Sequence, residues 1–292
     1  LSIMEKKNKN FIENLLNKKI VESKLLSDSF NINCIKIFTS DKKKYIVKYY
    51  KNKNLKFNAI KSEADNLIFF KNFKKNIFPK VYSNDSDFLV MSYIENDGIL
   101  PSETKDDLLS AIVSIHLNNS KYYGFEFDTQ IGGLKQKNKI SKNWPQFYRE
   151  NRLGYIFELI SLSNPMEDLI NHKIEFLLKN LEDFIPKTPK PSLLHGDLWE
   201  GNILFRDLKL VGFIDPGSFY GHNEMEVAYL RWFNPKFIDK NFINKYNENI
   251  RLDDYYLKYE FVYQLYYSLL NVYLWDRSYI NDVSNLLKKI SL

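Results

Sequence analysis

Residues 194–204 read Leu-His-Gly-Asp-Leu-Trp-Glu-Gly-Asn-Ile-Leu, and residues 212–216 read Gly-Phe-Ile-Asp-Pro. Asp197 and Asn202 are five positions apart, and Asp215 follows them at the end of an apolar, strand-like run. Phosphoryl transfer from a nucleotide needs a carboxylate near the accepting hydroxyl and oxygen ligands for Mg²⁺, and little covalent help. The spacing Asp-x-x-x-x-Asn, with a second aspartate one short hairpin later, is that of a kinase catalytic loop. We therefore predict Asp197 as the base and Asn202 and Asp215 as metal ligands.

Two residues upstream complete this set. Lys48 ends the apolar run 45–47, in the position of the strand lysine that contacts the α- and β-phosphates in kinases. Glu63 lies in the next helix-like segment and could pair with Lys48, which would fix the lysine rotamer. ATP and Mg²⁺ are the expected cofactors. Met91 and Tyr93, on an apolar run further along the chain, are further candidates for nucleotide binding.

Glycine is distributed unevenly along the 292 residues. None occurs before Gly98, and all ten lie between Gly98 and Gly221. The chain length suggests two domains, at about 100–200 residues each. We predict an N-terminal nucleotide-binding lobe over residues 1–94 and a C-terminal catalytic and substrate lobe over residues 95–292, with a hinge at residues 95–98.

The hydrophobic pattern predicts few strands and many helices. In the first lobe it predicts helices over residues 11–26 and 55–73 and strands over 32–38, 45–50 and 88–93. In the second lobe it predicts helices near residues 103–118, 145–162, 166–184, 224–233, 254–275 and 279–290, and short strands over 193–195, 203–205 and 210–214. The expected fold class is α+β: a two-lobed, protein-kinase-like fold with a small β-sheet-plus-helix N-lobe and a larger, mainly helical C-lobe.

Composition narrows the class of protein. Hydrophobic residues make up 44% and charged residues 27%, which is typical of a globular protein and excludes a disordered or collagen-like chain. A single cysteine, Cys34, excludes an internal disulfide and a cysteine-based metal site. The net charge of +6 is spread over many lysines without a basic stripe, so we expect no nucleic-acid partner. No apolar run approaches the ~18 residues that span a bilayer, and the first residues show no signal-peptide core. We expect a cytoplasmic protein with no membrane partner.

Longer motifs resemble the fructosamine kinase family. Residues 195–202 read His-Gly-Asp-Leu-Trp-x-Gly-Asn, and residues 215–224 read Asp-Pro-x-Ser-Phe-Tyr-Gly-His-x-Glu. Both are similar to that family, as are residues 123–125, 131–132, 136–138 and 143–153. The resemblance runs from about Lys24 to the C-terminus. The Asp-Leu-Trp and Ser-Phe-Tyr-Gly-His segments distinguish it from aminoglycoside, choline and homoserine kinases, which share only the histidine-glycine-aspartate, asparagine and aspartate pattern.

The resemblance implies an aminoglycoside-phosphotransferase-like fold and a reaction. The reaction is ATP-dependent phosphorylation of the sugar 3-hydroxyl of ketoamines, fructosamines or ribulosamines, on free lysine or on protein, as a step in deglycation and protein repair. It also implies the roles given above for Asp197, Asn202 and Asp215, with Lys48 and Glu63 as the phosphate-holding pair. Trp199, beside the base, and Trp275, late in the chain, are candidates for substrate contact.

Two departures from the family pattern keep alternatives open. The expected phosphate-covering loop, residues 26–32, contains no glycine, so we predict weakened ATP affinity. Residues 263–277 lack the histidine and the Phe-Gly pair that the family often has there. The alternatives are another small-molecule kinase of this fold, acting on an aminoglycoside, choline or methylthioribose, and a pseudokinase scaffold without turnover. The presence of every predicted catalytic residue argues against the scaffold.

Overall fold

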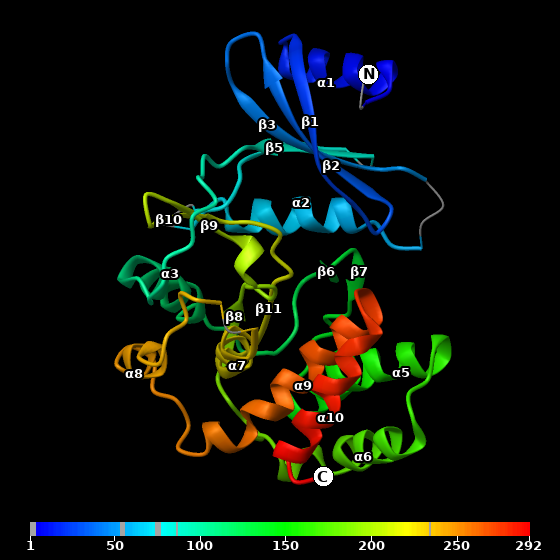
Figure 1. The fold of residues 1–292 in the computed structure, drawn as a ribbon, viewed down its shortest axis with the longest axis vertical. Coiled ribbons are helices and arrows are strands. Elements are labelled where there is room, and N and C mark those ends of the chain that lie inside the picture. The colour runs from blue at the N-terminus through cyan, green and yellow to red at the C-terminus, as the bar shows by residue number, and fades with distance from the viewer. Residues whose placement is uncertain (1–3, 53–55, 74–76, 86, 234) are drawn as a thin grey trace. The chain divides into compact units, whose positions relative to one another are not determined.

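The structure is a computed structural model that describes residues 4–52, 56–73, 77–85, 87–233 and 235–292. These residues form two compact units (Figure 1). Unit 1 contains residues 1–99, 129–135 and 202–217, and unit 2 contains residues 100–128, 136–201 and 218–292. The predicted division into domains after residue 94 stays a prediction. Residues 129–135 and 202–217 pack with the first part of the chain in unit 1.

Unit 1 is built on a five-stranded antiparallel sheet in the order β1-β2-β3-β5-β4. Its strands are β1 (Ile20–Ser29), β2 (Ile32–Thr39), β3 (Lys44–Tyr50), β4 (Val81–Asn84) and β5 (Phe88–Ser92). Helix α1 (Lys6–Leu16) buries Ile12 in a cluster with Ile35, Val47 and Val90 of one sheet face. The other elements are α2 (Ala59–Phe70), the hairpin β9 (Ile203–Arg206) and β10 (Lys209–Phe213), and the short pair β6 (Thr129–Ile131) and β7 (Leu134–Gln136).

The helix predicted over residues 11–26 is wrong in its second half. Helix α1 ends at Leu16 because Asn17 adopts the left-handed conformation at φ +52°. The chain then enters β1, where the buried Glu13 carboxylate accepts a hydrogen bond from Ile20 N at 2.8 Å. Strand β1 lies at the edge of the sheet and most of its side chains are exposed, so it lacks the alternation that identifies a strand. Pairing with β2 decides its structure.

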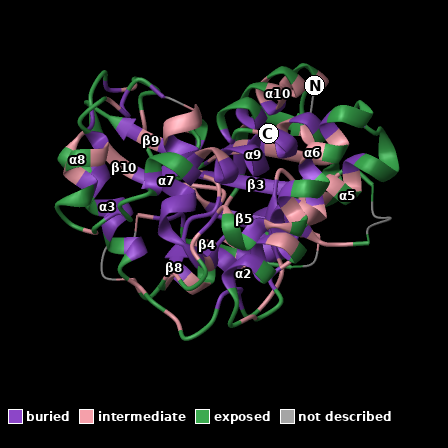
Figure 2. Ribbon diagram, turned by 90° about the horizontal axis from the view of Figure 1, so that it is seen from below, coloured by how far each residue is buried: buried purple, intermediate pink, exposed green. Residues whose placement is uncertain are grey.

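Unit 2 is mainly helical. Its helices are α3 (Asp106–His116), α4 (Trp144–Tyr148), a π-helical turn (Arg149–Leu153), α5 (Gly154–Ser163), α6 (Asp168–Lys179), α7 (Asn223–Phe233), α8 (Phe242–Asn247), α9 (Tyr256–Leu274) and α10 (Ile280–Lys289). Helix α9 packs against α5, α7 and α10 and is largely buried (Figure 2). Strands β8 (Pro191–Leu194) and β11 (Phe219–His222) pair antiparallel. Three 3₁₀ turns cover Leu181–Asp183, Glu200–Asn202 and Arg277–Tyr279.

The predicted fold class is confirmed. A small antiparallel sheet with a helix forms the first part of the chain, and helices dominate the remainder. The sequence analysis did not predict α8, β4, β6, β7 or β11, which are short. Over the residues that the structure describes, no helix is both long and apolar enough to cross a membrane.

Candidate active site

Three of the predicted residues meet in unit 1. Lys48 lies in β3, and its Nζ donates hydrogen bonds to both carboxylate oxygens of Glu63 in α2, at 2.8 and 2.9 Å. The same ammonium donates to Asp215 Oδ1 at 2.5 Å. The structure therefore assembles the lysine–glutamate pair that the spacing predicted, and it adds the aspartate to the pair.

The two carboxylates determine the charge of Lys48. Burial disfavours its ammonium form, but Asp215 and Glu63 outweigh burial and raise the pKa of Lys48 well above its ordinary value. The lysine is a permanent cation held at a fixed place. Cys34 pairs with Lys48 across β2 and β3, and burial raises the pKa of its thiol to about 11. Cys34 is therefore a neutral thiol rather than a reactive thiolate.

The β9–β10 hairpin brings the two predicted metal ligands to one place. Asn202 precedes β9 and Asp215 follows β10 by two positions, and Ile214 N donates to Asn202 O at 3.0 Å. Asp215 has a left-handed backbone at φ +52°, a strained conformation that is often found at functional sites. One carboxylate and one amide oxygen suit Mg²⁺, which is usually held by one or two carboxylates together with phosphate. Within the described ranges, no group of three His, Cys, Asp or Glu residues could hold a metal without such help.

Met91 and Tyr93 lie on and just after β5. Met91 pairs with Ile46, and Leu89 pairs with Lys48, in the antiparallel register of β3 and β5. Directly opposed residues point to the same face of a sheet, and alternate residues along a strand share that face. Met91 is therefore on the Lys48 face. Tyr93 is half-buried, and the Lys36 ammonium lies 4.5 Å from the centre of its ring.

The loop predicted to cover the phosphates is a tight hairpin turn. Phe30 and Asn31, between β1 and β2, have φ values of +53° and +64°. Both central residues of a two-residue turn of this kind need positive φ, which asparagine tolerates better than phenylalanine. The Asn31 side chain donates to Asn52 O at 3.0 Å, which helps to hold the turn without glycine. Lys51 forms an ion pair with Asp28, so the charge of Asp28 near this turn is compensated.

In unit 2, a buried carboxylate fixes the segment before Asp197. Glu226 of α7 accepts hydrogen bonds from Gly196 N at 2.7 Å and from His195 N at 3.1 Å. It also lies 2.7 Å from His116 Nε2. His195 Nδ1 accepts a hydrogen bond from Asp197 N at 3.1 Å, so this histidine supports the loop. The sequence analysis missed Glu226, because its spacing from the motif has no significance until α7 is folded beside β8.

Tyr229 is a further residue that sequence reasoning missed. One turn after Glu226, its hydroxyl donates to Asp197 Oδ1 at 3.4 Å. The Tyr229 ring stacks on Tyr267 of α9, with centroids 3.9 Å apart and planes 9° apart. Burial, with Asp197 nearby, raises the pKa of Tyr229 well above its ordinary value. The hydroxyl is therefore a neutral donor directed at the predicted base.

The two tryptophans have different surroundings. Trp199 is 37% exposed and lies edge-to-face with Phe233, with centroids 6.0 Å apart. Its ring covers Gly201, where an added Cβ would come within 2.2 Å of the indole. Trp275 follows the end of α9 and is 62% exposed. The substrate roles of both stay predictions.

Comparisons with known proteins identify the family of the chain. The model of the fructosamine kinase family matches residues 4–292. The chain belongs to the fructosamine kinase family. It is 30% identical to a probable ketoamine kinase of Enterococcus faecium over 211 residues, 70% of this chain and 73% of that protein. It is 29% identical over 203 residues to a chloroplastic protein-ribulosamine 3-kinase of Arabidopsis thaliana, 68% of this chain and 60% of that protein.

Solved structures share the fold. A protein of Thermobifida fusca assigned as a fructosamine-3-kinase superposes with a TM-score of 0.85 at 22% identity, covering 97% of this chain and 98% of that one. An aminoglycoside phosphotransferase solved with streptomycin and ATP superposes with a TM-score of 0.67 at 20% identity, covering 99% and 97%. The protein-kinase-like fold is thereby confirmed.

The structure also explains why the fructosamine kinase motif extends past Asp215. Ser218 Oγ donates to His195 O at 3.2 Å, which ties the segment after Asp215 to the segment before Asp197. His222 Nδ1 lies 2.7 Å from the Tyr263 hydroxyl. Glu224 accepts hydrogen bonds from Asp253 N and from the Tyr259 hydroxyl. These residues therefore tie segments of unit 2 to one another.

Proposed function

We propose that this protein is an ATP-dependent kinase that phosphorylates the 3-hydroxyl of fructosamines or ribulosamines. The observation that carries the proposal is the Lys48–Glu63–Asp215 cluster, in a chain whose family is fructosamine kinase. Relatives named as ketoamine and ribulosamine kinases support this substrate class over an aminoglycoside, choline or methylthioribose. We also propose a cytoplasmic location, as the sequence analysis expects.

On the nucleotide side, Lys48 would neutralise phosphate charge. Glu63 fixes the lysine, so the ammonium need not be ordered when ATP binds. Asp215 and Asn202 would hold Mg²⁺, which when bound withdraws charge from the phosphates. Since Lys48 also contacts Asp215, this aspartate would exchange part of its lysine contact for the metal. Met91 and Tyr93 would contact the adenine side of the nucleotide.

On the acceptor side, Asp197 would orient the sugar hydroxyl and accept its proton. Base catalysis of this kind contributes about 10²–10⁴-fold. Tyr229 would act as a positioning residue, because its hydroxyl donates to Oδ1 of Asp197 and so restricts the orientation of the carboxylate. Trp199 would offer an apolar wall to the sugar, and Trp275 a more distant contact.

The experiment is a coupled assay of ATP consumption with Mg²⁺, with Asp197→Asn as the blank. The acceptors are ribulose-lysine, fructose-lysine, a glycated protein, kanamycin and choline. Turnover on the ketoamines alone supports the proposal, and the ratio of free to protein-bound rates identifies the acceptor form. Turnover on kanamycin or choline alone would replace the substrate class. ATP binding without turnover on any acceptor would favour the scaffold.

A further inference from the structure

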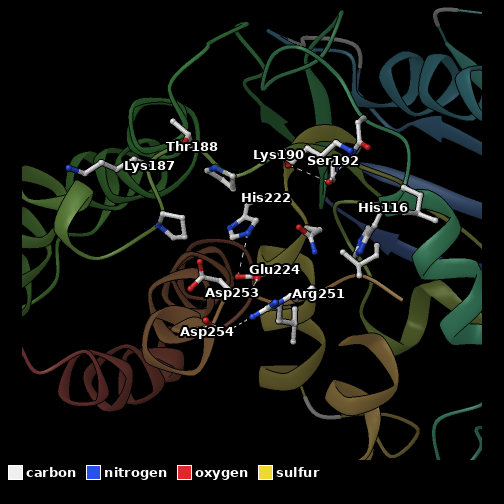
Figure 3. Close-up of a pocket in the computed structure, with 17 residues that line it drawn as sticks. His116, Lys187, Thr188, Lys190, Ser192, His222, Glu224, Arg251, Asp253 and Asp254 are labelled. Atoms are coloured by element: carbon white, nitrogen blue, oxygen red, sulfur yellow. Dashed lines mark hydrogen bonds and ion pairs between the residues drawn. The ribbon is translucent and has the colours of Figure 1, made fainter. Parts of the chain in front are cut away.

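Unit 2 contains a cavity of about 670 Å³ that none of the proposed catalytic or nucleotide residues lines (Figure 3). Its volume lies within the range of about 300–1,000 Å³ that is usual for small-molecule sites. Four segments contribute to its wall, namely residues 116–119, 186–192, 222–224 and 250–254. The cavity therefore has the size of a ligand site, and the mechanism above does not use it.

The floor of the cavity is polar but carries little charge. His222 is buried, and burial lowers its pKa to about 3, so its imidazole is neutral. Ser192 and Asn223 are also buried and uncharged. Glu224 is engaged by Asp253 N at 2.6 Å and by the Tyr259 hydroxyl. A ligand would contact polar groups at the floor, and its charged groups would interact with the charged side chains of the walls.

The walls carry opposite charges. In Figure 3, Lys187 and Lys190 lie on one side of His222, and Asp253 and Asp254 lie on the other. Both lysines are exposed, and neither has an ion-pair partner in the part of the chain that the structure describes. On the acidic side, Arg251 pairs with Asp254 at 3.1 Å. The two side chains are 80% and 78% exposed, so this pair contributes little and can be exchanged for a ligand.

We propose that this cavity binds a small zwitterion of the amino-acid type. Its carboxylate would face Lys187 and Lys190, and its ammonium group would face Asp253 and Asp254. A purely anionic ligand would be repelled by the two aspartates. A purely cationic ligand would be repelled by the two lysines. A bound metal does not fit, because no ligating cluster exists among the residues described.

A hydrogen-bond chain connects the cavity to the segment before the base. His116 lines the cavity and lies 2.7 Å from Glu226 through Nε2. Glu226 in turn accepts from Gly196 N and His195 N. His116 is itself buried, and its Nδ1 lies 2.7 Å from the Tyr246 hydroxyl, to which Asn223 of the cavity wall donates at 2.8 Å. An occupant that contacts Asn223 therefore acts through Tyr246 and His116 on the residues that precede Asp197. Occupancy of the cavity modulates the reaction through this chain, and this second part alone rests on the proposed function.

Binding is tested by calorimetric titration of the full chain with L-lysine. L-Norleucine, a zwitterion without the side-chain amine, should also bind, whereas cadaverine and glutarate should not. Lys187→Glu with Lys190→Glu should weaken L-lysine binding about tenfold or more. Lys240→Glu, an exposed lysine outside the cavity, is the matched control and should leave the affinity unchanged. Equal binding of cadaverine, or loss of affinity in Trp199→Ala instead, would overturn the proposal.

The connection to the base is tested without turnover. Hydrogen exchange of residues 193–199 should slow when L-lysine is added to the wild type, and should not respond in the double lysine variant. Saturating L-lysine that leaves this exchange unchanged would refute the coupling. Neither titration nor exchange requires a ketoamine acceptor, so failure here is distinct from failure of the proposed function.

Discussion

Replacing Glu226 with glutamine tests how the segment before Asp197 is held. The carboxylate is fully buried and has three partners, His195 N, Gly196 N and His116 Nε2. Glutamine keeps the shape but has one acceptor oxygen, so its NH₂ group must face a donor. A hydrogen bond to a charged group contributes about 1.5–3 kcal/mol, and a buried unsatisfied donor costs about 1–3 kcal/mol. Because these contributions overlap, we expect the free energy of unfolding to fall by about 3 kcal/mol.

The assay is urea unfolding followed by tryptophan fluorescence at pH 7 and in acid. Burial opposes ionisation of Glu226, but hydrogen bonds from His116 and Gly196 outweigh it and lower the pKa of Glu226 from its ordinary value of 4.5. A lowered pKa contributes stability above the ordinary value, and the contribution is lost as the pH falls through the folded-state pKa. The gap between wild type and Glu226→Gln should therefore narrow in acid.

Turnover should fall with stability in this variant. Loss of the anchor lets the segment before Asp197 shift, and misplacement by about 1 Å can cost about 10²-fold in rate. Glu248→Gln, at an exposed glutamate, is the control and should change the free energy of unfolding by less than about 0.5 kcal/mol. A Glu226→Gln protein as stable and active as this control would refute the reasoning.

Three further substitutions probe the site. Asp197→Asn should reduce turnover by about 10²–10⁴-fold while ATP binding is kept, and near-normal turnover would remove Asp197 from the base role. Tyr229→Phe should raise the pKa of Asp197, because it removes a donor to the carboxylate, and should move the acidic limb of the rate profile to higher pH; Tyr267→Phe is the control and should leave that limb in place. Gly201→Ala should raise KM for the acceptor, because the new Cβ displaces the Trp199 ring, and an unchanged KM would exclude Trp199 from the acceptor wall.

The Lys48–Glu63–Asp215 cluster was in part predictable, because Lys48 and Glu63 lie on regular elements that follow one another in the chain. Lys48 ends an apolar run and Glu63 lies in the next helix, so a hairpin followed by a helix brings them together. Asp215 belongs to a short-range motif, and a hairpin ladder determines its place. The Lys48–Glu63 pair and the place of Asp215 after its hairpin therefore follow from local sequence, whereas the Lys48–Asp215 contact joins positions 167 residues apart.

The supports of Asp197 could not be predicted in the same way. Glu226 and Tyr229 reach the segment from α7, about thirty positions later, and their pattern is that of an ordinary buried helix. The prediction for edge strand β1 was wrong for a different reason. Its exposed residues give no periodic signal, and its pairing partner β2 determines its conformation.

The most direct test of the central claim is to identify the product by NMR. Ribulose-lysine is incubated with ATP, Mg²⁺ and the protein, and the new phosphorus resonance is correlated with the sugar protons. We predict a phosphomonoester coupled to the proton at carbon 3, absent when Asp197→Asn replaces the wild type. A phosphate on any other hydroxyl, or no phosphorylated sugar from an enzyme that still binds ATP, would contradict the assignment as a ketoamine 3-kinase.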